Sequence, residues 1–519
     1  MKKYILIIST VLALINFNSC SDNELELLPP SADYAENINT EDKLQKMLNG
    51  AYYSIGSVSA YGNDLLVFGD ILGDKIFNTP SRASFLQTSE YNYNPNQNQF
   101  GFYGTLYKTI VSSNIVINNT LVEESNVTKR IKGEAKILRA LAYFTLVNYY
   151  SASPTSGVNQ EYGVPLVLGD YDVLIQPARA TVAEVYNQII KDLTEGMSQT
   201  SNPATKVTLG ADAAKLLLSK VYLTRRAAGD AQLALQYSTE LINKAVASYA
   251  PNDPTSDPTN SKPNPFITSK DLPAANYNNY FRGQDDSYSE NHPETIWELD
   301  INSLSNAVLG LGSNGALPVY YSLGDNTRRG LLANRTFYDS FGSATVIDVR
   351  RGPINTGLFS SQAVPSSDTP LGLWINKYPR ATRARVETPP LESPPLVSFV
   401  RNIKILRFSE AYFNRMEALR LLGQEGLALT ELNAFAASRK GLTYTSNTDL
   451  LTNILTEKSK EFYGEGQRFL DLKRYNLPVN RPSNCATCEL QATDKRFVLP
   501  LGQNAINQNA NLKQYPGYQ

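Results

Sequence analysis

Apolar positions recur every three or four residues along much of this chain, with polar residues between them. This spacing puts the apolar side chains on one face of an α-helix and predicts amphipathic helices around a core. Thr40 is a typical N-cap, and Glu41 and Asp42 would form an acidic first turn. The predicted helices cover residues 40–51, 104–122, 128–150, 182–197, 211–226, 232–247, 405–422, 426–438 and 450–463. In the second of them, the residues expected to face inward are Leu106, Ile110, Ser113, Ile117 and Leu121.

Two of the predicted helix pairs are similar to each other. In one pair, Gly229 in the turn is followed by Ala234 five residues later, and in the other Gly423 is followed by Ala428. Small residues at such positions let two helices approach closely, as in tetratricopeptide-type repeats. The pattern therefore predicts stacked helix pairs.

The middle of the chain has a different pattern. From residue 249 to about 395 it is rich in Pro, Asn, Ser and Gly, with short strand-like pieces such as Thr295–Leu299 around Trp297. Asp253 and Asp257 stand among turn residues, where a calcium ion is conceivable, although solvated turn residues are the favoured interpretation. Long irregular stretches of this kind usually carry function.

The first twenty residues indicate the cellular location of the protein. Lys2 and Lys3 precede a short apolar run that ends at Ser19-Cys20. A basic start, a short apolar segment and a small residue before a cysteine are typical of an export signal. We expect residues 1–19 to be a lipoprotein signal peptide, Cys20 to be lipidated, and residues 20–33 to form a tether.

The net charge and the numbers of histidines and cysteines restrict the kinds of functional site that the chain can form. The formal net charge is −1, which leaves no basic footprint for nucleic acid. The single histidine, His292, excludes sites that need two histidines, and its sequence context predicts an exposed loop. With Cys20 lipidated, Cys485 and Cys488 remain and are expected to form a local disulfide in an oxidising compartment.

Several segments in order along the chain are similar to the SusD/RagB family of outer-membrane lipoproteins of Bacteroidetes. The segments that carry the resemblance are residues 49–52, 133–144, 162–167, 211–222, 407–419, 457–474 and 497–518. Among them, Gly133-Glu134-Ala135 with Arg139 is similar to the family's most recognisable helix. Lys458 and Phe469 depart from the family's usual Arg and Trp.

The resemblance implies a mainly α, SusD-like fold, in which tetratricopeptide-like helix pairs support a loop-rich half with a few short strands. Residues 34–519 would form one domain: a helical part (34–248), a loop-rich ligand-facing part (249–400), and C-terminal helices with a closing segment (401–519). The family faces outward on the outer membrane, captures oligosaccharides and delivers them to a SusC-like TonB-dependent transporter. Capture of oligopeptides for a RagA-like transporter is the alternative. The resemblance implies no enzymatic activity and no cofactor or metal.

Three glutamates near the C-terminus suggest a different class of protein, a surface enzyme. Glu457, Glu461 and Glu465 are four residues apart and share one helix face. Retaining glycosidases hold two carboxyl groups about 5–5.5 Å apart, so a surface glycoside hydrolase is conceivable. Three stacked carboxylates need cations between them, and the sequence offers nearby Lys458, Lys460, Arg468, Lys473 and Arg474. A structural ion-pair network is therefore the preferred interpretation, and Glu134, Arg139 and Glu417 receive the same one.

Ligand capture is assigned to the irregular regions instead. The chain contains 31 tyrosines, whose flat faces and hydroxyls suit sugar rings. Two stretches, residues 77–102 and 276–321, combine tyrosines with amide or guanidinium side chains, as a capture surface requires. The ligand-binding residues predicted there are Asn78, Arg82, Tyr91, Tyr93, Asn96, Tyr280, Tyr288, Asn314, Tyr320 and Tyr321.

Overall fold

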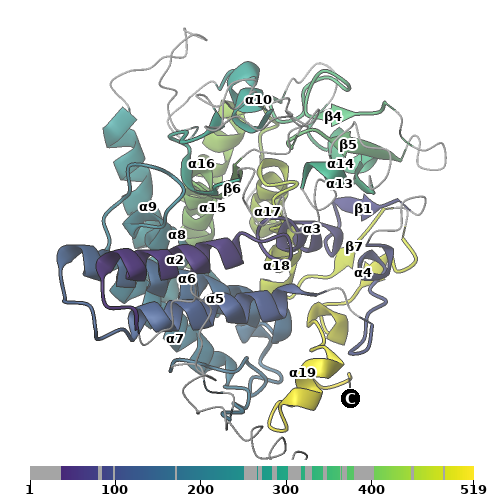
Figure 1. The fold of residues 1–519 in the computed structure, drawn as a ribbon. Helices are drawn as coiled ribbons and strands as arrows, with labels where there is room; N and C mark the ends of the chain where they lie inside the picture. Colours follow the sequence, from purple (N-terminus) through teal and green to yellow (C-terminus); the bar gives the residue numbers. More distant parts are fainter. Residues whose placement is uncertain are drawn as a thin grey trace, which may run out of the picture.

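A computed structural model gives the structure of the chain. It describes residues 37–79, 85–97, 100–169, 172, 174–249, 266, 272–282, 289–301, 317–321, 330–342, 348–362, 364, 371–378, 402–445, 449–482 and 485–518. Helices dominate the lower and left parts of the view, and short strands gather at the upper right (Figure 1). None of the described helices has the length and apolar character needed to cross a lipid bilayer.

The first half of the chain is a succession of helices. These are α2 (Glu41–Ile55), α3 (Asp64–Ile71), α4 (Leu86–Ser89), α5 (Phe102–Ile117), α6 (Asn126–Tyr150), α7 (Val182–Gln199), α8 (Ala211–Arg225) and α9 (Asp230–Tyr249), with a 3₁₀ turn at Pro154–Ser156. The predicted N-cap is confirmed, since the Thr40 side chain accepts a hydrogen bond from the backbone N–H of Lys43. The last four helices of this set pack in sequence order, α6 on α7, α7 on α8 and α8 on α9.

The C-terminal helices continue the same stack. They are α15 (Phe408–Leu421), α16 (Glu425–Ser438), α17 (Leu450–Glu461), α18 (Arg468–Arg474) and α19 (Gln503–Gln508), with a 3₁₀ turn at Lys495–Phe497. Helix α15 packs on both α9 and α16. The two predicted helix–turn–helix pairs are confirmed as α8–α9 and α15–α16. Gly229 and Gly423 turn the chain with positive φ, and Ala234 and Ala428 are fully buried.

The irregular part contributes short strands and small helices. They are β1 (Ile76–Asn78), α10 (Ala274–Arg282), β2 (Thr295–Leu299), α13 (Pro318–Tyr321), β3 (Leu331–Asn334), α14 (Arg335–Asp339), β4 (Phe359–Ser360), β5 (Gly372–Ile375) and β6 (Ile403–Arg407), followed later by β7 (Val479–Asn480) and β8 (Glu489–Leu490). Antiparallel pairs order one sheet β1-β3-β5-β4, and β2 pairs with β6 and β7 with β8. Trp297 in β2 is fully buried, as its strand-like context predicts.

Three predicted helix boundaries differ by three or more residues. Helix α2 continues to Ile55 rather than ending at residue 51, and the other two differences have local reasons. Helix α5 ends at Ile117 rather than residue 122, because the Asn119 side chain accepts from the backbone N–H groups of Leu121 and Val122 and replaces the helical bonds. Leu121 is consequently 55% exposed instead of facing inward. At the other end of the chain, residues 405–407 belong to β6, where they pair with β2, and helix α15 begins only at Phe408.

Candidate functional site

The two stretches predicted to bind ligand meet in the fold. Phe85 precedes α4 in the first stretch, and its ring centroid lies 5.1 Å from that of Tyr320 on α13 in the second. The next residue, Tyr321, donates its hydroxyl to Oδ2 of Asp70 on α3 at 2.6 Å. Helices α4 and α13 both lie on the right side of the molecule in Figure 1, around β1. These contacts join segments about 240 residues apart into one region, which we call the α4–α13 face (residues 85–97 and 317–321). Its described exposed side chains come from residues 85–97, because those described in α13 are buried.

The tyrosines of the first stretch support this face from within. Tyr91 is buried and donates its hydroxyl to the Leu72 carbonyl at 2.6 Å. The guanidinium of Arg481 lies 4.4 Å from the centre of the Tyr91 ring. Tyr93 is also buried and donates to the Arg496 carbonyl. The expected exposure of these two rings is therefore wrong, because a segment about 400 residues later in the chain covers them.

Arg481 organises the backbone beneath the same face. Its guanidinium donates hydrogen bonds to the carbonyl oxygens of Ile71, Gly73 and Ser89. Three carbonyls from two separate segments are thus fixed by one planar donor group, for which arginine is suited. The end of α3 and the end of α4 are held together in this way.

Asn78 likewise serves the scaffold. It is 3% exposed at the end of β1. With its amide oriented to match its neighbours, its nitrogen donates to the Gly330 carbonyl at 2.9 Å and its oxygen accepts from the Leu86 N–H at 2.8 Å. The oxygen therefore satisfies one of the free N–H groups at the start of α4. Asn78 positions α4 and does not itself reach the surface.

The tyrosines of the second stretch are in the interior as well. Tyr280 and Tyr321 are fully buried, and Tyr320 is 3% exposed. The Tyr280 hydroxyl lies 2.8 Å from the Thr295 hydroxyl. These three rings therefore do not form an exposed aromatic platform for a ligand. Tyr321 packs against α3, Tyr320 against Phe85 and Tyr280 against β2, which the local sequence around each tyrosine does not reveal.

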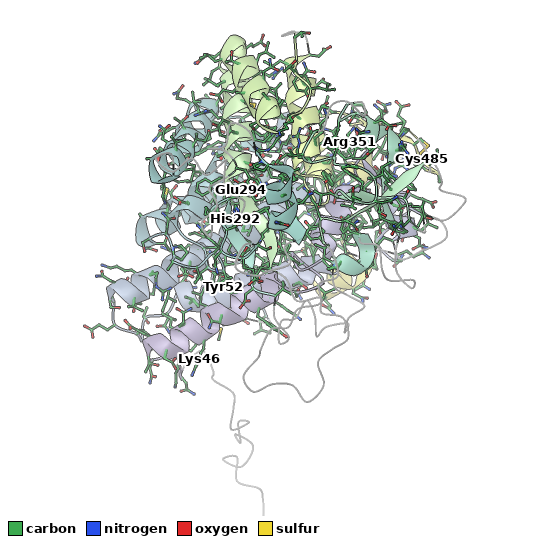
Figure 2. The ribbon with its side chains drawn as sticks, turned by 90° about the horizontal axis from the view of Figure 1, so that it is seen from above. Lys46, Tyr52, His292, Glu294, Arg351 and Cys485 are labelled. Carbon is green, nitrogen blue, oxygen red and sulfur yellow. A yellow bond between two sulfur atoms is a disulfide. The ribbon has the colours of Figure 1, made fainter. Side chains whose placement is uncertain are left out.

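His292 was predicted to be an exposed loop residue, and this is wrong. It is 1% exposed, and its ring centroid lies 4.8 Å from that of Tyr280. The Nδ1 atom accepts a hydrogen bond from the Glu294 N–H at 3.0 Å. Burial lowers the pKa of His292 well below its ordinary value, so the ring is neutral. His292 and Glu294 lie side by side near the middle of Figure 2, whereas Cys485 lies near its edge.

The surface of the α4–α13 face is provided by amide side chains. Gln87 on α4 is exposed, and so are Asn92 and Asn96 in the following segment. The turn that carries Asn96 is fixed, because Oδ1 of Asn94 accepts from the N–H of Asn96 at 2.9 Å. Of the predicted ligand-binding residues, Asn96 is the described one that is exposed. Three others, Arg82, Tyr288 and Asn314, lie outside the described residues. Gln87 and Asn92 were not predicted, since an isolated amide carries no sequence pattern.

Glu457, Glu461 and Glu465 form the predicted ion-pair network, but the prediction that they share one helix face is wrong, because α17 ends at Glu461 and Glu465 lies in the turn that follows. Glu457 and Glu461 are fully buried, and Glu465 is 7% exposed. Glu461 lies 3.1 Å from Arg407 and 3.3 Å from Arg439. Burial alone would raise the pKa of Glu461, but the surrounding guanidiniums outweigh it and lower the pKa to about 2.

The sources of the cations differ from the prediction. Arg350 binds Glu457 at 2.7 Å, and Arg407 binds Glu465 at 2.9 Å, both from segments distant in sequence. Of the nearby cations proposed, Lys460 does approach Glu457, at 3.8 Å. The others have different partners: Asp471 for Lys458, Asp74 for Arg468, the Asn148 carbonyl for Lys473 and Glu417 for Arg474.

The other charged residues predicted to form structural ion pairs, Glu134, Arg139 and Glu417, are also buried. Arg139 makes a two-pronged ion pair with Asp192 at 2.6 and 2.8 Å, and Glu134 accepts from the Tyr52 hydroxyl at 2.8 Å. All these groups are buried and occupied by partners from the protein. A sugar could not reach the carboxylates of α17, which removes the pair that suggested glycoside hydrolysis.

A cavity of about 110 Å³ lies elsewhere, between α6, α8, β6 and α18. Leucines make up much of its lining, and Lys220 at its wall pairs with the buried Glu410 at 2.7 Å. Small-molecule pockets are usually about 300–1,000 Å³ in size, so this cavity is too small for an oligosaccharide. It also has no lining residue from α4 or α13.

The structure tests the predicted disulfide but not the predictions for Asp253, Asp257 and Cys20. Cys485 and Cys488 form a disulfide, as expected. In the described part of the chain, no three or more His, Cys, Asp or Glu side chains are arranged to hold a metal ion. Asp253 and Asp257, considered for calcium, and Cys20 lie outside the described residues.

Comparison with known proteins identifies the family to which the chain is similar. A family model described as "Starch-binding associating with outer membrane" matches residues 24–223, and the model of the SusD family matches residues 400–518. The chain belongs to the SusD/RagB family. A SusD-like protein of Bacteroides ovatus is 26% identical to it over 265 residues, which are 47% of this chain and 45% of that protein. The match to this curated relative thus spans less than half of the relative's length.

Solved structures share the SusD-like fold. A SusD superfamily protein of Bacteroides thetaiotaomicron superposes with a TM-score of 0.73 at 24% identity, covering 92% of this chain and 100% of that one. A putative sugar binding protein of Bacteroides vulgatus gives 0.72 at 23% identity, covering 93% and 99%. Surface glycan-binding protein A of Bacteroides uniformis gives 0.65 at 19% identity, covering 92% and 100%. The mainly helical SusD-like fold predicted from the sequence is confirmed.

Proposed function

We propose that this SusD-family protein captures an oligosaccharide at the outer cell surface and delivers it, chemically unchanged, to a SusC-like TonB-dependent transporter. Family membership supports the general role, and the names of two structural neighbours, a sugar binding protein and a surface glycan-binding protein, support the ligand class. The observation that carries the proposal is the meeting of the two candidate stretches at Phe85 and Tyr320. A rigid scaffold there presents polar side chains to solvent.

The exposed amides are suited to carbohydrate. Gln87, Asn92 and Asn96 each offer a carbonyl acceptor and an NH₂ donor, which can bind the hydroxyl groups at the rim of a sugar ring. The sequence-predicted Arg82, Tyr288 and Asn314 would add a guanidinium, a ring and a further amide. The same amides could also pair with a peptide backbone, so oligopeptide capture for a RagA-like transporter is the second candidate.

The test is affinity electrophoresis of residues 21–519 through gels that contain different polysaccharides. The paired substitutions Gln87→Ala and Asn92→Ala should reduce the retardation by the bound glycan, because they remove surface donors without touching the core. Gln424→Ala, an exposed amide before α16, is the matched control and should leave retardation unchanged. Equal retardation of all three proteins would reject the α4–α13 face as the capture site.

Peptides are tested in parallel by calorimetry with a defined peptide mixture. Heat of binding with peptides, together with no retardation by any glycan, would favour the second candidate. Release of reducing sugar by the purified protein would contradict capture without chemistry.

The cell-surface location rests on the sequence-predicted lipid anchor. Cys20→Ala should move the protein from the membrane fraction to the soluble fraction, because no acyl chain would then hold it. Unchanged fractionation of this variant would reject lipid anchoring at Cys20.

A further inference from the structure

Helix α2 carries an exposed aromatic ring beside amide side chains. In the described part of the chain, Tyr53 is the aromatic residue with the largest exposed fraction, 52%. Asn49, four residues earlier, is exposed, and Gln45, a further four residues earlier, is half-buried. Side chains four residues apart are neighbours on one face of a helix. An aromatic ring bordered by amides, which the buried tyrosines of the α4–α13 face do not provide, is therefore present on α2.

A chain of hydrogen bonds fixes the orientation of the two amides. Arg130 on α6 donates from Nη2 to Oε1 of Gln45 at 2.9 Å. Because that oxygen accepts, the Gln45 nitrogen is the atom that donates to Oδ1 of Asn49, at 3.0 Å. The oxygen of Asn49 is thus occupied within the protein, and its NH₂ group is the part that can donate to a ligand.

The same chain of bonds begins in the core. Arg130 forms an ion pair with Glu134, which is 2% exposed. Glu134 also accepts from the Tyr52 hydroxyl at 2.8 Å, and that hydroxyl accepts from the Leu209 N–H at 2.7 Å. In Figure 2, Tyr52 lies nearer the interior and Lys46, on the same helix, lies at the lower edge of the ribbon. Anchoring of this kind lowers the entropy that the amides lose when a ligand binds.

Gly50 leaves open space beside the ring. It lies three residues before Tyr53, and residues three apart are also neighbours on a helix surface. A Cβ atom placed on Gly50 would meet no described atom within 4 Å beyond its own helix, so packing does not require glycine there. Glycine is unfavourable inside a helix. What it provides at this position is access to one side of the Tyr53 ring.

This combination indicates the class of ligand. A tyrosine ring offers a flat apolar face to the C–H groups of a sugar ring, and an NH₂ group can donate to the hydroxyls at the rim of that sugar. The charged side chains next to the ring on α2 pair with each other, since Lys46 lies 2.8 Å from Asp42. The ring and the amide, rather than a charge, would therefore bind the ligand.

We propose that Gln45, Asn49, Gly50 and Tyr53, which we call the α2 patch, form a second carbohydrate site. One sugar residue stacks on the Tyr53 ring and accepts a hydrogen bond from the Asn49 amide. The inference rests on the proposed function, in which the ligand is a glycan. Helix α2 lies in the left half of Figure 1, and α4 and α13 lie in the right half. A long polysaccharide that contacts both sites would bind more tightly than either site alone allows.

The experiment is affinity electrophoresis of residues 21–519 through gels that contain amylopectin, dextran, laminarin, xyloglucan or galactan. Tyr53→Ala should lower the apparent affinity for the retarding polysaccharide about tenfold or more, because one of two linked sites is lost. Tyr53→Phe keeps the ring and should restore most of the retardation. The matched control is Gln236→Ala on α9, an exposed amide that is also hydrogen-bonded one helical turn along, and it should leave retardation unchanged.

A further variant separates binding from folding. Gly50→Gln replaces glycine with a better helix former and places a side chain beside the Tyr53 ring. We expect weaker retardation of this variant with no fall in the midpoint of its thermal unfolding. A variant that loses retardation only because its helix is damaged would show a lower midpoint. Unchanged retardation of Gly50→Gln would overturn the role of Gly50 in access to the ring.

The outcomes separate the α2 patch from the proposed function. Weaker retardation of Tyr53→Ala and of the Gln87, Asn92 variant supports both sites. Weaker retardation of Tyr53→Ala alone supports the α2 patch and rejects the α4–α13 face. Unchanged retardation of Tyr53→Ala, with retardation lost in the Gln87, Asn92 variant, would overturn the α2 patch and leave the proposed function intact. A wild-type protein that none of these polysaccharides retards would overturn both.

Discussion

The three glutamates on and just after α17 and the tyrosines around α4 and α13 both look like functional sites in the sequence, and both are buried. They differ in how they are stabilised. Glu461 is held by charge, with three guanidiniums around it, whereas Tyr320 and Tyr321 are held by ring packing and one hydroxyl bond. The first arrangement excludes a ligand because every charge already has a partner. The second builds a surface, because the rings fix the segments that carry the exposed amides.

The largest effect should come from removing the central charge of the first region. Glu461→Gln leaves Arg350, Arg407 and Arg439 buried with less negative charge to balance them. We expect a loss of about 3–5 kcal/mol in the free energy of unfolding, measured by urea denaturation. Glu195→Gln removes a half-exposed ion pair with Lys136 and should cost less than about 1 kcal/mol. Similar small losses in both variants would show that the network around Glu461 is not structural.

A smaller effect should come from the hydroxyl that ties α13 to α3. Tyr321→Phe removes the donor to Asp70 without changing the ring, and leaves a buried carboxylate oxygen without its bond. The expected cost is about 1–3 kcal/mol in the free energy of unfolding. Tyr53→Phe, at a tyrosine that is 52% exposed, should change it by less than about 0.5 kcal/mol. Equal costs for the two variants would contradict a supporting role for Tyr321.

Asp70 should also make the second region sensitive to pH. Burial raises its pKa to about 7, although the hydroxyl of Tyr321 acts in the opposite direction. Between about pH 4 and pH 7 the folded protein then binds more protons at Asp70 than the unfolded chain does, so stability falls as pH rises. Asp70→Asn removes this loss. As pH rises through this window, the free energy of unfolding of the variant should increase relative to that of the wild type by up to about 1.4 kcal/mol per pH unit. A difference in free energy of unfolding that does not change with pH would contradict the raised pKa of Asp70.

The smallest effect on stability should be at the surface amides. Gln87→Ala and Asn92→Ala should each change the free energy of unfolding by less than about 0.5 kcal/mol, because both side chains are exposed. Their expected effect is on glycan retardation alone. A large loss of stability in either variant would show that these amides belong to the scaffold. The distinction between buried tyrosines that support the face and exposed amides that contact a ligand would then be wrong.

The sequence predicts those features that depend on near neighbours. Helix periodicity and the glycines of the two helical turns are local, and the helices and both turn pairs follow from them. The ion-pair network could also be predicted, since carboxylates this close in sequence require cations between them, even though Glu465 lies beyond the end of α17. The identity of those cations could not be predicted, because Arg350, Arg407 and Arg439 reach the helix from distant segments.

Burial of single residues was much harder to predict. Tyr91, Tyr93 and His292 lie in loop-like sequence, yet later segments cover the two tyrosines, and Phe266 and Tyr280 pack on His292. Leu121 is the opposite case, because one asparagine side chain ended the helix early and left an apolar residue outside. In each case the deciding contact comes from a group that the pattern of apolar positions does not contain. The meeting of the two candidate stretches could therefore be recognised only in the fold.

The position of Arg481 has a consequence for how the protein is made. It binds carbonyl oxygens 392, 408 and 410 residues earlier in the chain, so the ends of α3 and α4 stay unfixed until nearly the whole polypeptide has been synthesised. Contacts over such distances form late and slow the folding reaction. A nascent chain that stops short of Arg481 can complete its early helix pairs but not the α4–α13 face. Only a chain that includes Arg481 can assemble the proposed capture surface.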